Sequence, residues 1–222
     1  MRNKIRIAYN PCFHLPLLAW MVIGGILLLT FNKEVLFASI NTHYSVPADY
    51  VMYYITWMGQ PEVIIPTLIF LLLLIPSIRS GWFFLSAIVC NITPLGIQQL
   101  LKRYFHHPRP LNYFHWTEHK AAWIHYLPQW PELLRNSFPS GHSQGAFSFF
   151  CFLSLLLPAR YRWWGTVFFL CALMVCYSRM YLAAHFFADV YTGSLIGGIT
   201  TTLLFSVMEM FKPVKKIKKI IV

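Results

Sequence analysis

Six long apolar segments, separated by short polar ones, constrain the fold of this chain more than any other feature. They cover about residues 15–31, 62–78, 82–101, 143–157, 163–176 and 191–211. A helix of about 20 apolar residues is as long as the hydrocarbon core of a bilayer is thick. The segments therefore predict an all-α bundle of six transmembrane helices.

The composition agrees with a membrane protein. Hydrophobic residues make up 57% of the 222-residue chain and charged residues only 11%, whereas roughly 25% of the residues in a soluble domain are charged. So few charges cannot cover the surface of a soluble globule. Because no internal repeat or low-complexity linker divides the chain, we expect one membrane-embedded domain over residues 1–222.

The formal net charge of +11 could suggest a nucleic-acid partner. However, the basic residues do not form one face interleaved with aromatic side chains, as nucleic-acid binding requires. Most stand between apolar segments or in the tail, residues 212–222, which holds five lysines. This distribution is typical of cytoplasmic flanks that contact anionic headgroups, so we expect a bilayer and no nucleic acid as partner.

The lysine and arginine distribution also predicts the orientation. Six spans put both termini and the turns near residues 79 and 160–162 on one side, with 11 of the 18 lysines and arginines. That side should be cytoplasmic. The N-terminus resembles a signal sequence but lacks a small-residue cleavage site, so we expect an uncleaved first span.

Three polar clusters fall in the outer connections, all on the predicted non-cytoplasmic side. They comprise Lys102, Arg109 and Pro110; Pro139, Ser140, Gly141 and His142; and Ser178, Arg179, His185 and Asp189. Three cations with a single carboxylate demand an anion, and guanidinium groups match phosphate oxygens. The second cluster should stand at the start of the fourth span, where backbone N–H groups favour phosphate.

The histidines of these clusters suggest phosphoryl transfer. His185 and Asp189 are spaced i, i+4, which predicts one helical face. The carboxylate could hold one ring nitrogen and leave the other as a nucleophile, while His142 could protonate the leaving group. This set of groups needs neither a metal nor another cofactor.

The three clusters resemble the signature motifs of the type 2 phosphatidic acid phosphatase family, in order and with its internal spacings, within residues 102–189. The resemblance implies that Lys102, Arg109, Ser140, Gly141 and Arg179 bind phosphate. It also implies that His142 is the general acid, that His185 becomes a phosphohistidine and that Asp189 orients it. The soluble vanadium haloperoxidases share these motifs, but the six spans argue against that branch.

The family implies a bacterial-type inner-membrane enzyme facing the periplasm that hydrolyses a lipid phosphate. Its members act on phosphatidate, phosphatidylglycerophosphate, undecaprenyl diphosphate or lipid A phosphates. The wide aromatic outer loop slightly favours the last two, as bulky lipids. Two alternatives stay open: a phosphotransferase that passes phosphate to a second lipid, and a non-catalytic phospholipid carrier. A carrier would be expected to show internal repeats.

Other patterns receive simpler interpretations. The string His115-Trp116-Thr117-Glu118-His119 matches the zinc-protease pattern H-x-x-E-H, but no third ligand is evident and we expect no metal. Tryptophans at 116, 123 and 130 recur every seven residues, which fits an interfacial belt or surface helix or, alternatively, a lid over lipid chains. The five cysteines have no framework spacing and should behave as small buried hydrophobes.

Overall fold

Each predicted span contains a helix in the computed structural model, which describes residues 7–76, 78, 80–117, 123–129 and 134–213. The described residues form helices and no strands, which confirms the all-α prediction. In chain order the elements are α1 (Pro11–Thr30), α2 (Lys33–Asn41), α3 (Val46–Ile55), η1 (Thr56–Gly59), α4 (Pro61–Leu74), α5 (Gly81–Phe105), α6 (Pro110–Thr117), α7 (Gly141–Leu156), η3 (Ala159–Tyr161), α8 (Trp164–Tyr181) and α9 (Phe187–Met210).

Four helices are long and apolar enough to cross a membrane, namely α1, α5, α8 and α9. A fifth span is formed if α3 with η1 and α4 are taken together, although they meet at a bend of 60°. The 16 residues of α7 make it shorter than these. The chain is thus an integral membrane protein, and the count of six spans stays a prediction.

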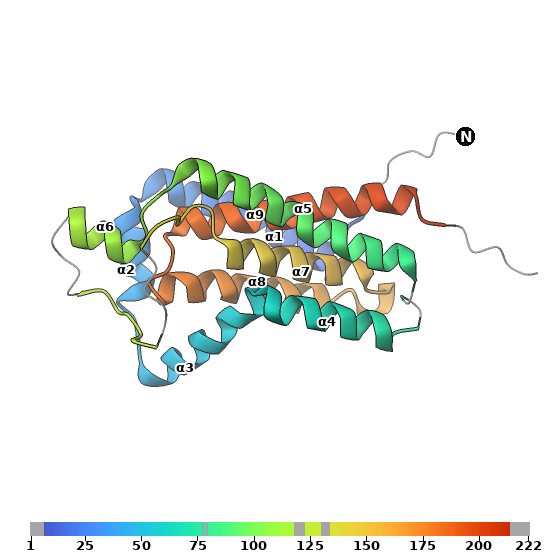
Figure 1. Ribbon diagram of the computed structural model, residues 1–222, viewed down its shortest axis with the longest axis horizontal. Coiled ribbons are helices and arrows are strands. Elements are labelled where there is room, and N and C mark those ends of the chain that lie inside the picture. The colour runs from blue at the N-terminus through green and yellow to red at the C-terminus, as the bar shows by residue number, and fades with distance from the viewer. Residues whose placement is uncertain (1–6, 77, 79, 118–122, 130–133, 214–222) are drawn as a thin grey trace, which may run out of the picture.

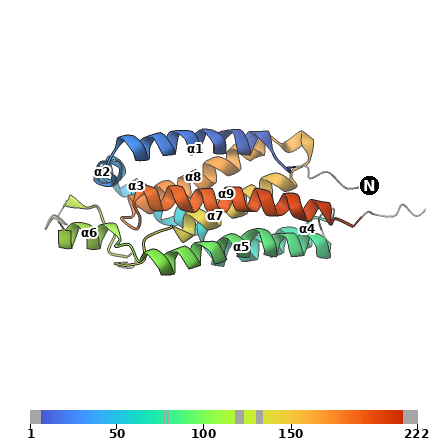
Figure 2. The same ribbon diagram turned by 90° about the horizontal axis from the view of Figure 1, so that it is seen from above.

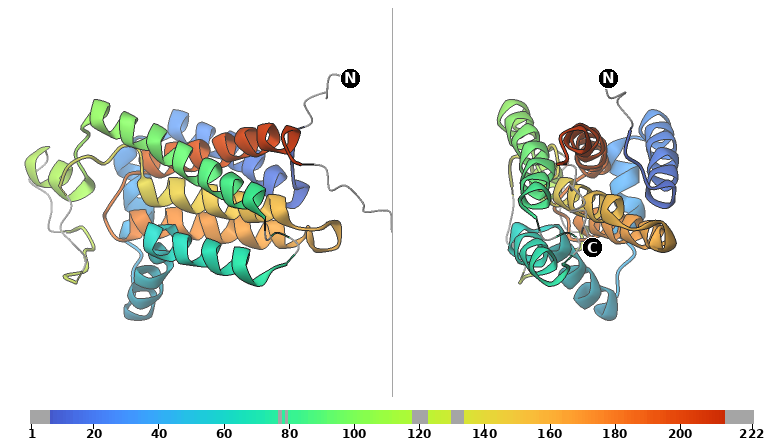
Figure 3. Two further views of the ribbon diagram at one scale, coloured as in Figure 1. Left: turned by 45° about the vertical axis from the view of Figure 1, so that its right-hand side comes forward. Right: turned by 90° about the vertical axis from the view of Figure 1, so that its right-hand side faces the viewer.

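The central helix is α7, which packs against α5, α8 and α9 (Figures 1 and 3). Helix α1 covers α8 and α9 from outside (Figure 2). The short helices α2, α3 and α6 gather at one end of the bundle, while α1 begins and α9 ends at the other (Figure 1). Residues used to orient the chain, including Arg2, Lys4, Arg6, Arg79, Lys120 and the lysines at 215, 216, 218 and 219, lie outside the described residues.

Small residues allow the close contact between α7 and α9. A methyl group on Gly197 would lie 2.9 Å from the Cβ atom of Phe147, tighter than atoms pack. Small residues four apart, here Gly193 and Gly197, are a common device for bringing helix backbones together in membranes. The contact continues to the start of both helices, where the Ser140 N–H donates to the Asp189 carbonyl at 3.0 Å.

Two of the prolines inside helices are compensated by neighbouring helices, as lipid requires. Pro94 removes the N–H that would otherwise bind the carbonyl of Cys90, and the Thr201 hydroxyl on α9 donates to that carbonyl at 2.8 Å. The Cys12 carbonyl, freed by a proline in α1, likewise accepts a hydrogen bond from Thr166 at 3.0 Å. Hydroxyl side chains from other helices thus donate to the backbone carbonyls that the prolines leave without a partner.

The two long outer connections are more ordered than the sequence suggested, since they contain α2, α3, η1 and α6. Trp123 is half-buried and its ring contacts those of Phe37 and Phe114, with centroids 6.0 and 4.9 Å away. Residues 118–122, which separate it from α6, lie outside the described residues. The side chain of Trp116 and all of Trp130 lie outside the described residues. The belt and lid interpretations therefore remain untested.

The cysteines follow the sequence interpretation. All five thiols are free, and Cys90, Cys151 and Cys176 are buried among apolar side chains. They act as small packing residues.

Candidate functional site

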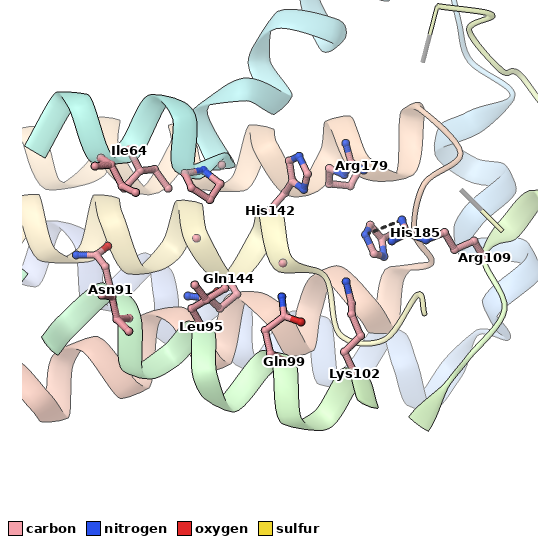
Figure 4. Close-up of a pocket in the computed structure, with 16 residues that line it drawn as sticks. Ile64, Asn91, Leu95, Gln99, Lys102, Arg109, His142, Gln144, Arg179 and His185 are labelled. Carbon is pink, nitrogen blue, oxygen red and sulfur yellow. Dashed lines mark hydrogen bonds between the residues drawn. The ribbon is translucent and has the colours of Figure 1, made fainter. Parts of the chain in front are cut away.

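The three polar clusters meet around one cavity of about 300 Å³ beside the start of α7 (Figure 4). One part of its wall is polar and includes Lys102, Arg109, Gly141, His142, Arg179 and His185. The other part is largely apolar and lies between α4 and α5, with Pro61, Ile64, Ile65, Ile92 and Leu95. Residues separated by 83 positions in the sequence thus share one site, as their predicted placement on one side required.

His185 and Asp189 form the predicted pair, with Nδ1 of the imidazole 3.4 Å from Oδ2 of the carboxylate. The expected common helical face is wrong, however, because His185 precedes α9 and lies in the loop after α8. Asp189 stands in the first turn of α9, where its Oδ2 accepts the Phe186 N–H at 2.9 Å. The helix start therefore fixes the carboxylate, and the loop brings the imidazole to it.

Ser137 belongs to this pair, although the sequence did not indicate it. Its hydroxyl donates to Oδ2 of Asp189 in a short hydrogen bond, and its oxygen lies 3.3 Å from Nδ1 of His185. The Ser137 side chain is fully buried. Its position two residues before Pro139 gave no spacing signal, because the contact depends on the path of the loop.

Arg109 contacts the opposite nitrogen of the same imidazole. Its Nη1 lies 3.2 Å from Nε2 of His185 and donates to the Ala184 carbonyl at 3.0 Å. Its Nε donates to the Arg135 carbonyl at 2.9 Å. Burial lowers the pKa of Arg109 to about 10, and nearby Asp189 partly opposes this shift. The guanidinium thus stays charged near neutral pH and is held in place by backbone carbonyls.

Arg179 is fully buried in the last turn of α8. Its Nη1 donates to the Thr56 hydroxyl at 2.8 Å. Thr56 begins η1, the short segment at the bend between α3 and α4. A fully buried guanidinium is costly unless an anion or several acceptors face it. Thr56 was not foreseen, because no sequence pattern links residue 56 to residue 179.

The loop of the second polar cluster stands at the start of a helix, as predicted. Ser140 is the N-cap of α7, and its hydroxyl accepts the Ser143 N–H at 3.4 Å. Gly141 is the first helical residue, so free N–H groups of the first turn lie beside the cavity. Gln98, fully buried on α5, donates to the Pro139 carbonyl at 2.8 Å. Helix α5 therefore holds the loop from behind and also carries Lys102 in its last turn.

His142 lies in the first turn of α7, and its side chain borders the same cavity. Figure 4 shows Lys102, His142, Arg179 and His185 turned toward a common space. The structure thus brings together His185, His142, Lys102, Arg109 and Arg179 in a single wall. Ser140 and Asp189 support that wall from behind through the contacts described above.

The environment of His185 favours the neutral imidazole. Burial lowers its pKa well below 6.5, and the neighbouring charges of Arg109, Arg179 and Lys102 lower it further. A neutral ring has one nitrogen with a free electron pair. With Nδ1 facing Asp189, the electron pair stands on Nε2, which Nη1 of Arg109 approaches to 3.2 Å.

The zinc-protease string is only partly covered by the described structure. The part of the chain with defined placement contains no group of three or more His, Cys, Asp or Glu side chains that could bind a metal. His115 is exposed on α6, while Glu118 and His119 lie outside the described residues.

Comparison with known proteins places this site in a family. Residues 80–213, which include all three polar clusters, match the PAP2 superfamily. The chain belongs to the PAP2 superfamily. The sequence resemblance is thereby confirmed.

Three relatives illustrate the range of the superfamily. An undecaprenyl-diphosphatase of Sulfolobus acidocaldarius is 28% identical over 204 residues, which cover 90% of this chain and 89% of the relative. A lipid A 1-phosphatase of Rhizobium etli is 33% identical over 102 residues, 46% of this chain and 40% of the relative. The fold matches the crystal structure of a transmembrane PAP2-type phosphatidylglycerolphosphate phosphatase from Bacillus subtilis, with a TM-score of 0.65, 21% identity and coverage of 92% and 98%.

Proposed function

We propose that this PAP2 protein hydrolyses a phosphorylated membrane lipid through a phosphohistidine at His185, without a divalent metal. The observation that carries the proposal is the setting of one imidazole, with Nδ1 facing Asp189 and Nε2 facing Arg109. An oriented, neutral ring beside a basic wall is what an activated nucleophile for phosphate requires.

In the first step, Nε2 of His185 attacks phosphorus and the bond between phosphorus and the lipid oxygen breaks. His142 gives its proton to that oxygen, so the lipid leaves as an alcohol or, from a diphosphate, as a monophosphate. In the second step, His142 takes a proton from water while the water oxygen attacks phosphorus. The N–P bond breaks, inorganic phosphate leaves and both histidines return to their initial states.

The cations stabilise the charge on the transferred group. Arg109 and Arg179 offer planar donors that match phosphate oxygens, Lys102 adds a point charge, and the N–H groups after Ser140 add their dipoles. Preorganised positive groups of this kind often supply the largest part of phosphoryl-transfer catalysis. They occupy the place that metal ions take in other phosphatases, which is why we expect metal-independent hydrolysis.

The shape of the cavity supports a lipid substrate. From the basic wall it extends between α4 and α5, where Ile64, Ile92 and Leu95 face it. A ligand that places phosphate among the cations would therefore place its next part against apolar side chains. Sites for amphiphiles combine polar and apolar walls in this way. The predicted charge bias puts the opening on the periplasmic side, with both termini in the cytoplasm.

The direct test is phosphate release by purified protein in detergent. The panel should contain phosphatidate, phosphatidylglycerophosphate, undecaprenyl diphosphate and lipid A phosphate, with His185→Ala as the blank. We expect release from at least one lipid and none from the variant. Equal release by the variant would refute the nucleophile, and release from none of the four by wild-type protein would refute the activity.

A second test separates the roles of the histidines. In His142→Ala the proton donor is lost, and its contribution, typically about 10²–10⁴-fold, matters little for a good leaving group. A nitrophenyl phosphate should therefore still phosphorylate His142→Ala but never His185→Ala. Label trapped by rapid quench at mildly alkaline pH should accumulate in the His142 variant. Label in His185→Ala, or equal losses with good and poor leaving groups, would refute these roles.

A further inference from the structure

One side of the short helix α3 packs on the bundle and the other side is exposed. On the packed side, Asp49 accepts a hydrogen bond from the Tyr181 hydroxyl at 2.5 Å and lies 2.7 Å from Nε2 of His125. The exposed side chains of α3 and η1, called here the outer face of α3, carry no charge and are Val46, Pro47, Tyr50, Val51, Tyr54 and Trp57. An exposed apolar face of this kind marks a surface that a membrane or a protein partner covers.

The position and composition of the outer face favour the bilayer. Helix α3 projects from the end of the bundle where α2 and α6 also lie (Figures 1 and 3). The chain continues through η1 into α4, where the side chains of Ile65, Ile69 and Phe70 are exposed, as on a helix that faces lipid. Tyrosine and tryptophan are enriched where a membrane meets water, and they make up half of the outer face.

Helix lengths place α3 at the boundary of the hydrocarbon layer. Helix α4 has 14 residues and is therefore about 21 Å long, shorter than a hydrocarbon core of about 30 Å. The segment of α3 and η1 meets α4 at 60°. With α4 near the bilayer normal, this segment crosses only about 10 Å of the membrane, half of its own length. Helix α3 thus lies in the outermost layer, where interfacial helices are found.

The inner end of α3 reaches the candidate active site. Thr56, the residue after α3, accepts a hydrogen bond from Nη1 of Arg179 at 2.8 Å, and both side chains are fully buried. A methyl group on Gly59 would lie 2.5 Å from the carbonyl oxygen of His142, so η1 is pressed against the first turn of α7. A change in the tilt of α3 would therefore move the hydroxyl that holds Arg179.

We propose that the outer face of α3 docks in the headgroup layer of the bilayer, and that this docking holds Thr56 against Arg179 and so supports phosphate binding. The docking is independent of catalysis, whereas the coupling to Arg179 rests on the phosphatase function proposed above. The rings of Tyr50 and Tyr54 enter the apolar boundary while their hydroxyls stay among the headgroups. The bilayer is thus a further support of the phosphate site.

Spin labels test the docking without turnover. Nitroxides are attached at Tyr50→Cys and Tyr54→Cys in nanodiscs of phosphatidylethanolamine and phosphatidylglycerol. The background carries alanine at the two partly exposed cysteines, Cys12 and Cys171. We expect a higher ratio of relaxation by oxygen to relaxation by a water-soluble nickel chelate than at His43→Cys, which is exposed after α2.

Two outcomes would overturn the docking. An equal ratio at the three labelled sites would place the outer face of α3 in water. Low accessibility of Tyr50→Cys and Tyr54→Cys to both reagents would show that a protein partner, such as a second copy of the chain, covers the face in place of lipid.

Kinetics in the same nanodiscs test the coupling to Arg179. Thr56→Val removes the hydroxyl and keeps the volume of the side chain. A hydrogen bond to a charged group corresponds to about 10- to 150-fold in affinity, so we expect KM to rise by up to that factor and by more than kcat falls. Thr56→Ser, which restores the hydroxyl, should recover most of the loss.

The outer face of α3 should act through the same hydroxyl. Tyr50→Ser combined with Tyr54→Ser should also raise KM. The matched pair Val22→Ser and Ile26→Ser, two exposed positions four residues apart on α1, should not. When the two tyrosine substitutions are added to Thr56→Val, KM should rise by less than the product of the separate effects.

Effects that multiply, or an unchanged KM in Thr56→Val, would overturn the coupling. Binding of inorganic phosphate, measured by isothermal titration calorimetry, decides the coupling without catalysis, since Thr56→Val should weaken it by a similar factor. If wild-type protein hydrolyses no lipid but loses phosphate affinity in Thr56→Val, the phosphatase function is refuted and the coupling stands. If lipid is hydrolysed and Thr56→Val binds phosphate as the wild type does, the coupling is refuted and the phosphatase function stands.

Discussion

Replacing Ser137 by alanine should slow phosphorylation of His185 without weakening the binding of the substrate. The Ser137 hydroxyl donates to the same carboxylate oxygen of Asp189 that lies 3.4 Å from Nδ1 of the imidazole. The Phe186 N–H, at 2.9 Å, also donates to that oxygen. Without Ser137 the carboxylate loses one of its restraints, and the ring it orients gains freedom to turn away from phosphorus.

A hydrogen bond to a charged group contributes about 1.5–3 kcal/mol, or about 10- to 150-fold in rate. We expect a loss of this size in kcat, with KM little changed, because the cations that hold phosphate are untouched. The assay is rapid-quench formation of phosphoenzyme, with substrate binding measured separately.

The matched control for this substitution is Ser86→Ala. Ser86 is equally buried, but its hydroxyl donates to the Trp82 carbonyl in its own helix at 2.8 Å. If Ser137→Ala behaves like Ser86→Ala, or if it raises KM instead of lowering kcat, Ser137 does not position the catalytic pair.

Four further predictions concern pH, metals, inhibition and sidedness. Because burial and nearby cations lower the pKa of His185 well below 6.5, the free enzyme should keep its nucleophile unprotonated at mildly acidic pH. The acid limb of kcat/KM, corrected for substrate ionisation, should then lie below 6.5, and a limb at or above that value contradicts the inference. Hydrolysis should survive EDTA; loss with EDTA and recovery with zinc would point to His115 and His119. Vanadate, which adopts the five-coordinate geometry of in-line transfer, should inhibit, and indifference at millimolar concentration (roughly the weak limit of specific binding) would speak against a phosphohistidine. His43→Cys, exposed after α2, should react with an impermeant thiol reagent from the periplasm and Arg160→Cys should not; the reverse labelling would invert the topology.

The sequence was a good guide where local chemistry determines structure. Apolar length predicted where the helices of the bundle lie, and the start of α7 followed from Ser140 and Gly141, whose capping contacts are local. The meeting of the three polar clusters followed from their placement on one side of the bundle. Each of these features depends on residues close in the sequence or on a simple count of spans.

The sequence did not predict those contacts that depend on the path of the backbone through loops. His185 was expected on a helix with Asp189, but the loop after α8 brings it to the carboxylate from outside the helix. Ser137 and Thr56 were not foreseen, because they reach Asp189 and Arg179 only through the folded loop and the bend before α4. No sequence pattern around a serine or threonine in a loop indicates which distant residue its hydroxyl will contact.

The hydrogen bond from Thr201 to the Cys90 carbonyl has a consequence for how the protein is made. If α5 enters the membrane before α9 has been synthesised, its proline leaves one carbonyl open to lipid. The group that satisfies it arrives about 110 residues later, in the last helix, and an unsatisfied carbonyl in hydrocarbon costs several kcal/mol until then. Helix α9 thus completes the hydrogen bonding of α5, and a chain that stops before α9 should carry a polar defect that membrane quality control can detect.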